Sequence, residues 1–129
     1  MRRLERWPTL LADYVEGALG RPFCFGKHDC CSFAAGAIEA ITGETVPLPA
    51  YADAREAAEA LAAESLSSRV RSILGPPIAP ASAQRGDLAM VLVDGRETLA
   101  VCVGGMMVAP GAGGLVFVET SAAVAAWRV

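Results

Sequence analysis

Residues 22–43 read PFCFGKHDCCSFAAGAIEAITG, and this stretch decides the fold. From Cys30 onward the apolar residues recur at helical spacing, and Gly43 stands where a helix would end. Asp29 is suited to cap the first turn, because its carboxylate can accept hydrogen bonds from free backbone N–H groups. The stretch therefore predicts a buried helix over about 30–41 that begins at a thiol.

The same stretch holds three of the four cysteines and the only histidine, His28. Cys30 falls at the helix N-terminus, where the partial positive charge of the helix dipole favours a thiolate. Cys30 is therefore a candidate nucleophile. The alternative is that Cys30 and Cys31 are small hydrophobes at a helix start, since free cysteine is among the most buried residue types.

Length and composition predict one domain over residues 1–129, in which small aliphatic residues fill most of the core: 53% of residues are hydrophobic and 6% aromatic. A formal net charge of −3 without a basic run argues against nucleic acid as a partner. Neighbouring Cys30 and Cys31 would form a disulfide only with strain, and Cys102 is far away in sequence. Reduced thiols are therefore expected.

Two segments bear on targeting and membranes. The N-terminus, MRRLERWP, is basic but no apolar region follows, so no signal peptide is expected. Residues 98–118 carry no charge and are long enough to span a bilayer. Gly104-Gly105 and the glycine-rich run at 110–114 divide this segment into short pieces, which indicates strands and turns. No membrane span is expected.

The first part of the chain, to about residue 75, is predicted to be helical. An apolar stripe over residues 7–18 ends at Gly20. Asp53 and Glu56 form a capping-box pattern that opens an alanine-rich helix to about Glu64. Ser67 is a candidate cap for one more helix, which Gly75-Pro76-Pro77 would end.

From Gly86 the pattern changes to strands, with a strong hairpin signal at Asp94-Gly95. The predicted strands are 87–93, 99–103, 106–109 and 115–118. Residues 121–127 fit a short helix or a final strand, and we favour a helical turn with Trp127 packed on the body. Helices over about 1–75 followed by antiparallel strands over about 86–129 predict an α+β fold.

Three motifs carry a family resemblance: Phe25-Gly26, Asp29-Cys30-Cys31 and, some fifty residues on, Gly86-Asp87-Leu88. They resemble the NlpC-like cell-wall peptidases, which have an aromatic-Gly loop, Asp-Cys-Ser at the head of a helix and a Gly-Asp-Leu strand. The resemblance implies a papain-like fold of N-terminal helices on a C-terminal antiparallel sheet, with Cys30 at the nucleophile position.

A closer resemblance, over nearly the whole chain, is to small phage and prophage tail proteins, which are often encoded among tail-tip genes and near gene-transfer-agent clusters. The shared motifs are an arginine-rich Trp-Pro segment at 2–8, PFxxGxHDCC at 22–31, GPP at 75–77, QRGD at 84–87 and AWRV at 126–129. The resemblance implies a structural or assembly component of the virion tail, present in the host cytoplasm before assembly. Its implied partners are other tail-tip or hub proteins.

The sequence departs from the peptidase pattern where the catalytic histidine belongs. That position, at the head of the strand after Gly-Asp-Leu, holds Thr98, and the third polar position falls on Met107 or Val108. A thiol nucleophile needs a base to hold its thiolate and to protonate the leaving group. We therefore expect a degenerate site. The alternative is an active peptidase or amidase that cleaves peptidoglycan with Cys30.

His28 could substitute as the base, since it lies two residues before Cys30. The negative charge of Asp29 works against a thiolate there, and a loop positions catalytic groups poorly. The other interpretation is that His28 caps the loop by bonding to a backbone carbonyl.

A metal-binding module is a further alternative, because Cys24, His28, Cys30 and Cys31 are ligands that zinc or an iron–sulfur cluster accepts. The spacing is unfavourable: no C-x2-C pair is present, and neighbouring helical residues point about 100° apart. The sequence therefore predicts no metal and no cofactor.

The uncharged block also predicts a docking surface. The glycine-rich tip at 111–114 and the flanking Val108, Leu115 and Phe117 are poorly explained as solvent-facing, and exposed apolar patches often mark interaction sites. The basic N-terminus, with Arg2, Arg3 and Arg6, is a second candidate surface. The alternative is a hairpin tip that folds against its own helix.

Overall fold

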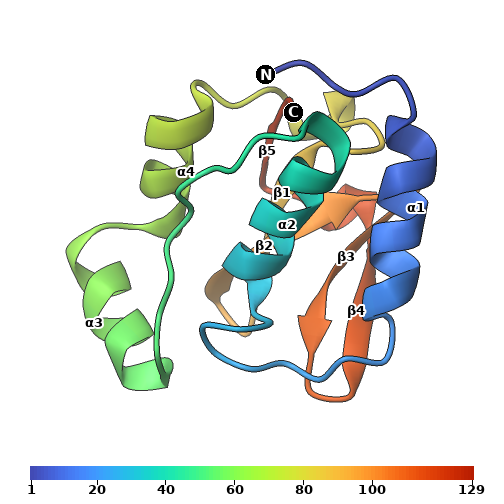
Figure 1. Ribbon diagram of the computed structural model, residues 1–129. Helices are drawn as coiled ribbons and strands as arrows, with labels where there is room; N and C mark the ends of the chain where they lie inside the picture. Colours follow the sequence, from blue (N-terminus) through green and yellow to red (C-terminus); the bar gives the residue numbers. More distant parts are fainter.

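The computed structural model describes all 129 residues, with helices in the first half of the chain and strands in the second (Figure 1). The helices are α1 (Trp7–Ala18), α2 (Cys30–Thr42), α3 (Ala54–Ala63) and α4 (Leu66–Leu74). The strands are β1 (Leu88–Val93), β2 (Arg96–Cys102), β3 (Met106–Gly111), β4 (Gly114–Glu119) and β5 (Ala125–Trp127). This arrangement confirms the predicted α+β class. None of the helices is long and apolar enough to cross a membrane.

Helix α2 forms as its sequence predicts. The Asp29 side chain accepts from the backbone N–H of Ser32 at 2.8 Å, and the Ser32 hydroxyl oxygen accepts in return from the Asp29 N–H. Gly43 ends the helix with φ = 77°, a left-handed conformation that favours glycine. Both ends of the helix are thus specified locally.

Helices α1 and α2 pack side by side through an aromatic contact. The rings of Tyr14 and Phe33 stack with centroids 5.2 Å apart, and the Tyr14 hydroxyl donates to the Phe33 carbonyl at 2.8 Å. Gly36 makes this approach possible, because a Cβ there would overlap the Tyr14 hydroxyl. The helix pair covers one face of the sheet (Figure 1).

The sheet is antiparallel, with strand order β4-β3-β2-β1-β5. Asp94 and Gly95 both have positive φ, at 51° and 76°, which fits the tight hairpin between β1 and β2. Alternate strand residues divide between two buried clusters. The larger joins Leu88, Met90, Leu99 and Val101 to α1 and α2, and the smaller gathers Ala89, Val91, Ala100 and Cys102 on the opposite face.

The sheet opens between β2 and β3. These strands pair only at Val101–Val108 and Cys102–Met107, whereas β1–β2 and β3–β4 pair along their length. Continuing the register by two residues would place Leu99 opposite Pro110. Proline has no N–H to contribute to a ladder, so pairing stops there. The two hairpins separate beyond this point.

Two predictions are wrong: the residue that caps α4, and the conformation of the last segment of the chain. The side chain that caps α4 is that of Ser65, which accepts from the Ser68 N–H, while Ser67 lies inside the helix and binds the Glu97 carboxylate on β2. At the C-terminus, Ala125–Trp127 is a strand and not a helical turn; the turn is confined to Thr120–Ala122. Pairing with β1 satisfies the backbone there and buries Trp127 to 1% exposure.

The prediction that the segment around residues 111–114 forms a docking surface is also corrected in part. The tip of the β3–β4 hairpin folds against the C-terminal end of α1, because the Leu115 N–H donates to the Leu19 carbonyl at 3.0 Å. Gly114 lies so close that a Cβ would overlap the same carbonyl. Val108 is buried in the core and Leu115 packs against it, whereas Phe117 is 48% exposed. Only the outer part of the segment is available to a partner.

Candidate functional site

A pocket of about 690 Å³ lies where the two hairpins separate. The β1–β2 arm contributes Val91, Val93, Arg96, Glu97 and Thr98, and the β3–β4 arm contributes Ala109, Pro110, Gly111, Val116 and Val118. The start of α2, the loop before it and helices α3 and α4 complete the walls. The lining is mostly apolar, as in typical ligand pockets.

Cys30 lines this pocket, and its surroundings lower the pKa of its thiol. Its Sγ lies 4.0 Å from the Sγ of Cys31, at the start of α2. A hydrogen bond from the Cys31 thiol lowers the pKa of Cys30; burial opposes this effect, and a hydrogen bond from the Leu99 main chain adds to it. The sheet opening explains the last contact, because the Leu99 backbone has no partner on β3. The net result favours a thiolate.

The other three thiols differ from Cys30. The hydrogen bond given to Cys30, together with burial, raises the pKa of Cys31 far above its ordinary range. Burial raises the pKa of Cys102 to about 11. Cys24 is exposed in the loop, and no disulfide forms among the four. Cys30 is thus the cysteine that combines a lowered pKa with access to the pocket.

Thr98 and Cys30 line the same pocket. The Thr98 hydroxyl is 3.5 Å from the carbonyl of Arg96, and a hydroxyl cannot serve as a base at neutral pH. Met107 and Val108 are both fully buried in the core. The strand positions expected for a base and its orienting group therefore hold no imidazole or carboxylate.

His28 is not among the residues that line the pocket. Its ring is 4% exposed and meets Phe33 edge-on, with centroids 5.8 Å apart. The residue closes a short backbone loop: the His28 N–H donates to the Cys24 carbonyl, and the His28 carbonyl accepts from the Cys24 N–H. Its Nε2 atom has no hydrogen-bond partner. Burial, followed by the charge of Arg21, lowers the pKa of His28.

The side chain of Asp29, which precedes Cys30, forms hydrogen bonds within the loop and the first turn of α2. Its carboxylate accepts from the Gly26 and Ser32 N–H groups, both at 2.8 Å.

The four residues considered as metal ligands do not converge: no group of three His, Cys, Asp or Glu side chains is arranged to hold a metal ion.

Sequence reasoning missed Tyr51, which also lines the pocket. Its side chain is 8% exposed, yet its hydroxyl has no hydrogen-bond partner. The Tyr51 carbonyl lies against Gly26, where a Cβ would stand 3.0 Å away and φ is +77°. Tyr51 follows a proline-containing connector, and no spacing pattern links it to Cys30, so the sequence carries no signal for it.

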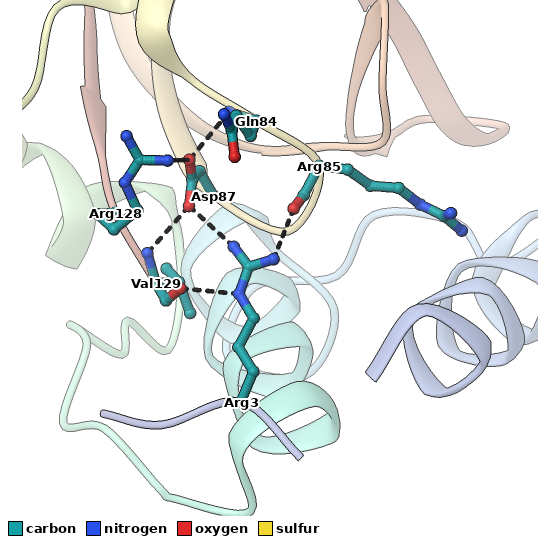
Figure 2. Close-up of polar contacts among 6 residues, drawn as sticks. All are labelled: Arg3, Gln84, Arg85, Asp87, Arg128 and Val129. Carbon is teal, nitrogen blue, oxygen red and sulfur yellow. Dashed lines mark hydrogen bonds and ion pairs between the residues drawn. The ribbon is translucent and has the colours of Figure 1, made fainter. Parts of the chain in front are cut away.

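A second polar centre surrounds Asp87, the residue that directly precedes β1 (Figure 2). This carboxylate is fully buried and accepts from the guanidinium groups of Arg3, at 2.9 Å, and Arg128, at 3.2 Å. It also accepts from the N–H groups of Gln84 and Val129, at 2.9 and 3.0 Å. The network joins both ends of the chain to the first strand.

This network corrects the expectation that Arg3 is free to dock a partner. Arg3 also donates to the main-chain oxygens of Arg85 and Val129, at 2.8 Å each, and its guanidinium stacks on Trp7 at 4.2 Å from the ring centroid. Gly86 allows the close approach, because a Cβ there would meet the guanidinium at 2.9 Å. Arg2 and Arg6 remain exposed.

The fold and pocket thus define a small α+β protein with a cysteine at a helix N-terminus in a largely apolar cleft. The chain belongs to a family described as a domain of unknown function, DUF6950, whose profile matches residues 2–129. The matched span includes Cys30, Tyr51 and every residue of the Asp87 network. A search of curated proteins finds no match.

Proposed function

We propose that this protein is a structural or assembly component of a phage-type tail, in the tail-tip or hub region, and that it has a papain-like, NlpC-type fold with a degenerate peptidase site. The observation that carries the degenerate site is the pocket itself, in which Cys30 has no imidazole neighbour and His28 is buried elsewhere. Peptide hydrolysis needs a group that protonates the departing amine, and no histidine lines the pocket to do so.

The tail role is supported by the motifs at 2–8, 84–87 and 126–129, which the resemblance to tail proteins singled out. Arg3, Asp87 and Arg128 from these motifs form one network around the buried Asp87 carboxylate, which gives the shared residues a structural role. The partners are other tail-tip or hub proteins, and the protein resides in the virion tail after assembly in the host cytoplasm.

The test is tail incorporation of two variants in a phage that encodes this chain. Cys30→Ala should support normal assembly, because no reaction of the thiol is required. Phe117→Glu should block incorporation without lowering the melting temperature, because Phe117 is 48% exposed on the edge strand β4. The matched control is Val124→Glu, another exposed apolar residue (55%), which precedes β5 at the opposite edge.

Normal incorporation of Phe117→Glu would show that the partner binds elsewhere. Loss of assembly with Cys30→Ala would contradict the degenerate site.

The second candidate is an active cysteine peptidase or amidase acting on cell-wall peptides. The lowered pKa of Cys30 within a ligand-sized pocket favours it. Release of stem-peptide fragments from peptidoglycan by the purified protein, abolished in Cys30→Ala, would establish this activity. His28→Phe would then show whether the histidine contributes.

A further inference from the structure

The edge of β2 that faces the pocket has main-chain groups without a strand partner. The Cys102 N–H donates to the Asp87 carbonyl, so the main chain of Cys102 points towards β1. Because the N–H and C=O groups of successive strand residues point to opposite sides, those of Glu97, Leu99 and Val101 point towards β3. Only Val101 has a partner there. Glu97 and Leu99 therefore present their main-chain groups to the space between the two hairpins.

Most of these groups are not used by the protein itself. The Leu99 N–H is directed at the Cys30 sulfur, which leaves the Leu99 carbonyl and both main-chain groups of Glu97. None of the loops or caps bonds to them. They repeat every second residue, about 6.7 Å along β2, which is the spacing at which a neighbouring strand offers its own donors and acceptors. A free strand edge of this kind is where another polypeptide adds a strand.

The walls of the pocket suit an extended segment with apolar side chains. Most lining residues are apolar, and Phe23, Phe25, Leu61, Val91 and Val116 are the largest of them among the loop, α3 and both hairpins. Successive side chains of a strand point to opposite faces, so a segment beside β2 would contact this lining on both sides.

The charged residues of the pocket leave one positive charge without a partner. The Asp29 carboxylate accepts from two N–H groups, and the Glu97 carboxylate binds Ser67. Arg96, the remaining charged residue of the lining, is exposed and takes part in none of the four ion pairs of the protein. A carboxylate beside the apolar part of the segment is complementary to this guanidinium.

We propose that the pocket between β2 and β3 is a docking site for an extended apolar segment of a partner protein, which adds as a strand to the free edge of β2 and places an acidic side chain near Arg96. Main-chain hydrogen bonds to Glu97 and Leu99 hold the segment, and the apolar walls and Arg96 select it. The segment is bound and not cleaved. The proposal does not depend on the tail role.

The probe is the peptide Glu-Val-Thr-Val-Glu, blocked at both ends and added to the full chain at millimolar concentration. Its two carboxylates allow either strand direction. Hydrogen exchange of the Glu97 amide should slow several-fold, and so should alkylation of Cys30 by iodoacetamide, because Cys30 lines the same pocket. Exposed Cys24 is the internal control and should keep its alkylation rate.

Two related peptides test the parts of the proposal separately. The same peptide N-methylated at its central residues keeps the side chains but cannot pair, so it should give no protection. The peptide with lysine in place of glutamate should bind more weakly. Equal protection by the N-methylated peptide, equal or tighter binding of the lysine peptide, or no protection by any of them would overturn the proposal.

Glu97→Pro and Glu97→Ala form a matched pair of variants. Both lose the contact with Ser67, but only proline removes the N–H that faces the pocket, and this N–H is not part of the ladder with β1. Glu97→Ala should bind the peptide as the wild type does, whereas Glu97→Pro should bind it about five- to tenfold more weakly, the effect of one hydrogen bond. Equal affinities would exclude main-chain pairing at Glu97.

Arg96→Glu tests the charge without altering the strand edge. It should weaken binding of the glutamate peptide and strengthen binding of the lysine peptide. The control is Arg55→Glu, an exposed arginine on α3 that does not line the pocket and should change neither. The same response to both substitutions would contradict the assignment of Arg96.

Discussion

Cys30 and His28 are only two positions apart, and burial acts on the pKa of both side chains. Their hydrogen-bond partners decide how far burial determines each pKa. Cys30 is half-buried but receives hydrogen bonds from Cys31 and Leu99, which lower its pKa in spite of burial. His28 is nearly inaccessible, and its Nε2 atom has no partner, so burial lowers its pKa and favours the neutral ring. The arrangement favours the thiolate of Cys30 and the neutral ring of His28.

The state of His28 predicts an acid-sensitive fold. The folded protein disfavours the protonated ring, so stability is complete above the unfolded pKa of about 6.5 and falls as the pH drops below it. Urea unfolding at pH 7.5 and 5.5 should show a loss of stability in the wild type. His28→Phe keeps a ring beside Phe33 but cannot titrate, so most of this loss should disappear. An equal loss in both proteins would contradict the assignment, because His28 is the only histidine.

At the scale of elements, the pocket exists because β2 and β3 stop pairing. Pro110 faces β2 at the point where the ladder would continue to Leu99, and it has no N–H to offer. The freed Leu99 backbone turns to Cys30 instead. One proline therefore both opens the pocket and supplies the thiol with a donor.

Pro110→Ala should extend the ladder by one rung and narrow the pocket. We expect a gain of about 1 kcal/mol in the free energy of unfolding from the added hydrogen bond. Alkylation of Cys30 by iodoacetamide should slow several-fold, because Leu99 is drawn towards β3. Exposed Cys24 serves as an internal control in the same peptide map. Unchanged Cys30 alkylation would mean that the hairpins separate for another reason.

At the scale of the whole molecule, Asp87 connects segments that are far apart in the chain. Arg3 precedes the first helix, Arg128 follows the last strand, and both reach the same buried carboxylate (Figure 2). Removing one partner of a buried charge pair leaves the other uncompensated. The closure of the two ends against β1 thus depends on one side chain.

Asp87→Asn should lower the free energy of unfolding by about 3 kcal/mol, since Arg3 then loses its counter-charge in a largely buried position. Arg128→Ala is the matched control: its side chain is 50% exposed, and the loss should stay below about 1 kcal/mol. Urea unfolding measures both. Similar small losses in the two variants would show that the network positions the termini without stabilising them.

The sequence alone determined the parts of this protein that depend on local physics. The cap at Asp29, the stop at Gly43 and the hairpin at Asp94-Gly95 each involve residues within a few positions of one another, so the helix and the turn were predictable. The placement of Cys30 at a helix N-terminus followed from the same pattern. The α+β order followed from the change of hydrophobic period.

Tertiary structure decided the rest, because those features join residues distant in the chain. The hydrogen bond from Leu99 to Cys30, the unpartnered hydroxyl of Tyr51 and the closure around Asp87 depend on which surfaces meet when the helices pack on the sheet. The final strand at Ala125–Trp127 is a similar case, since so short a segment becomes a strand only when β1 offers it an edge. Local propensity does not indicate which distant residues become partners. Burial and strand pairing in the folded protein decide that.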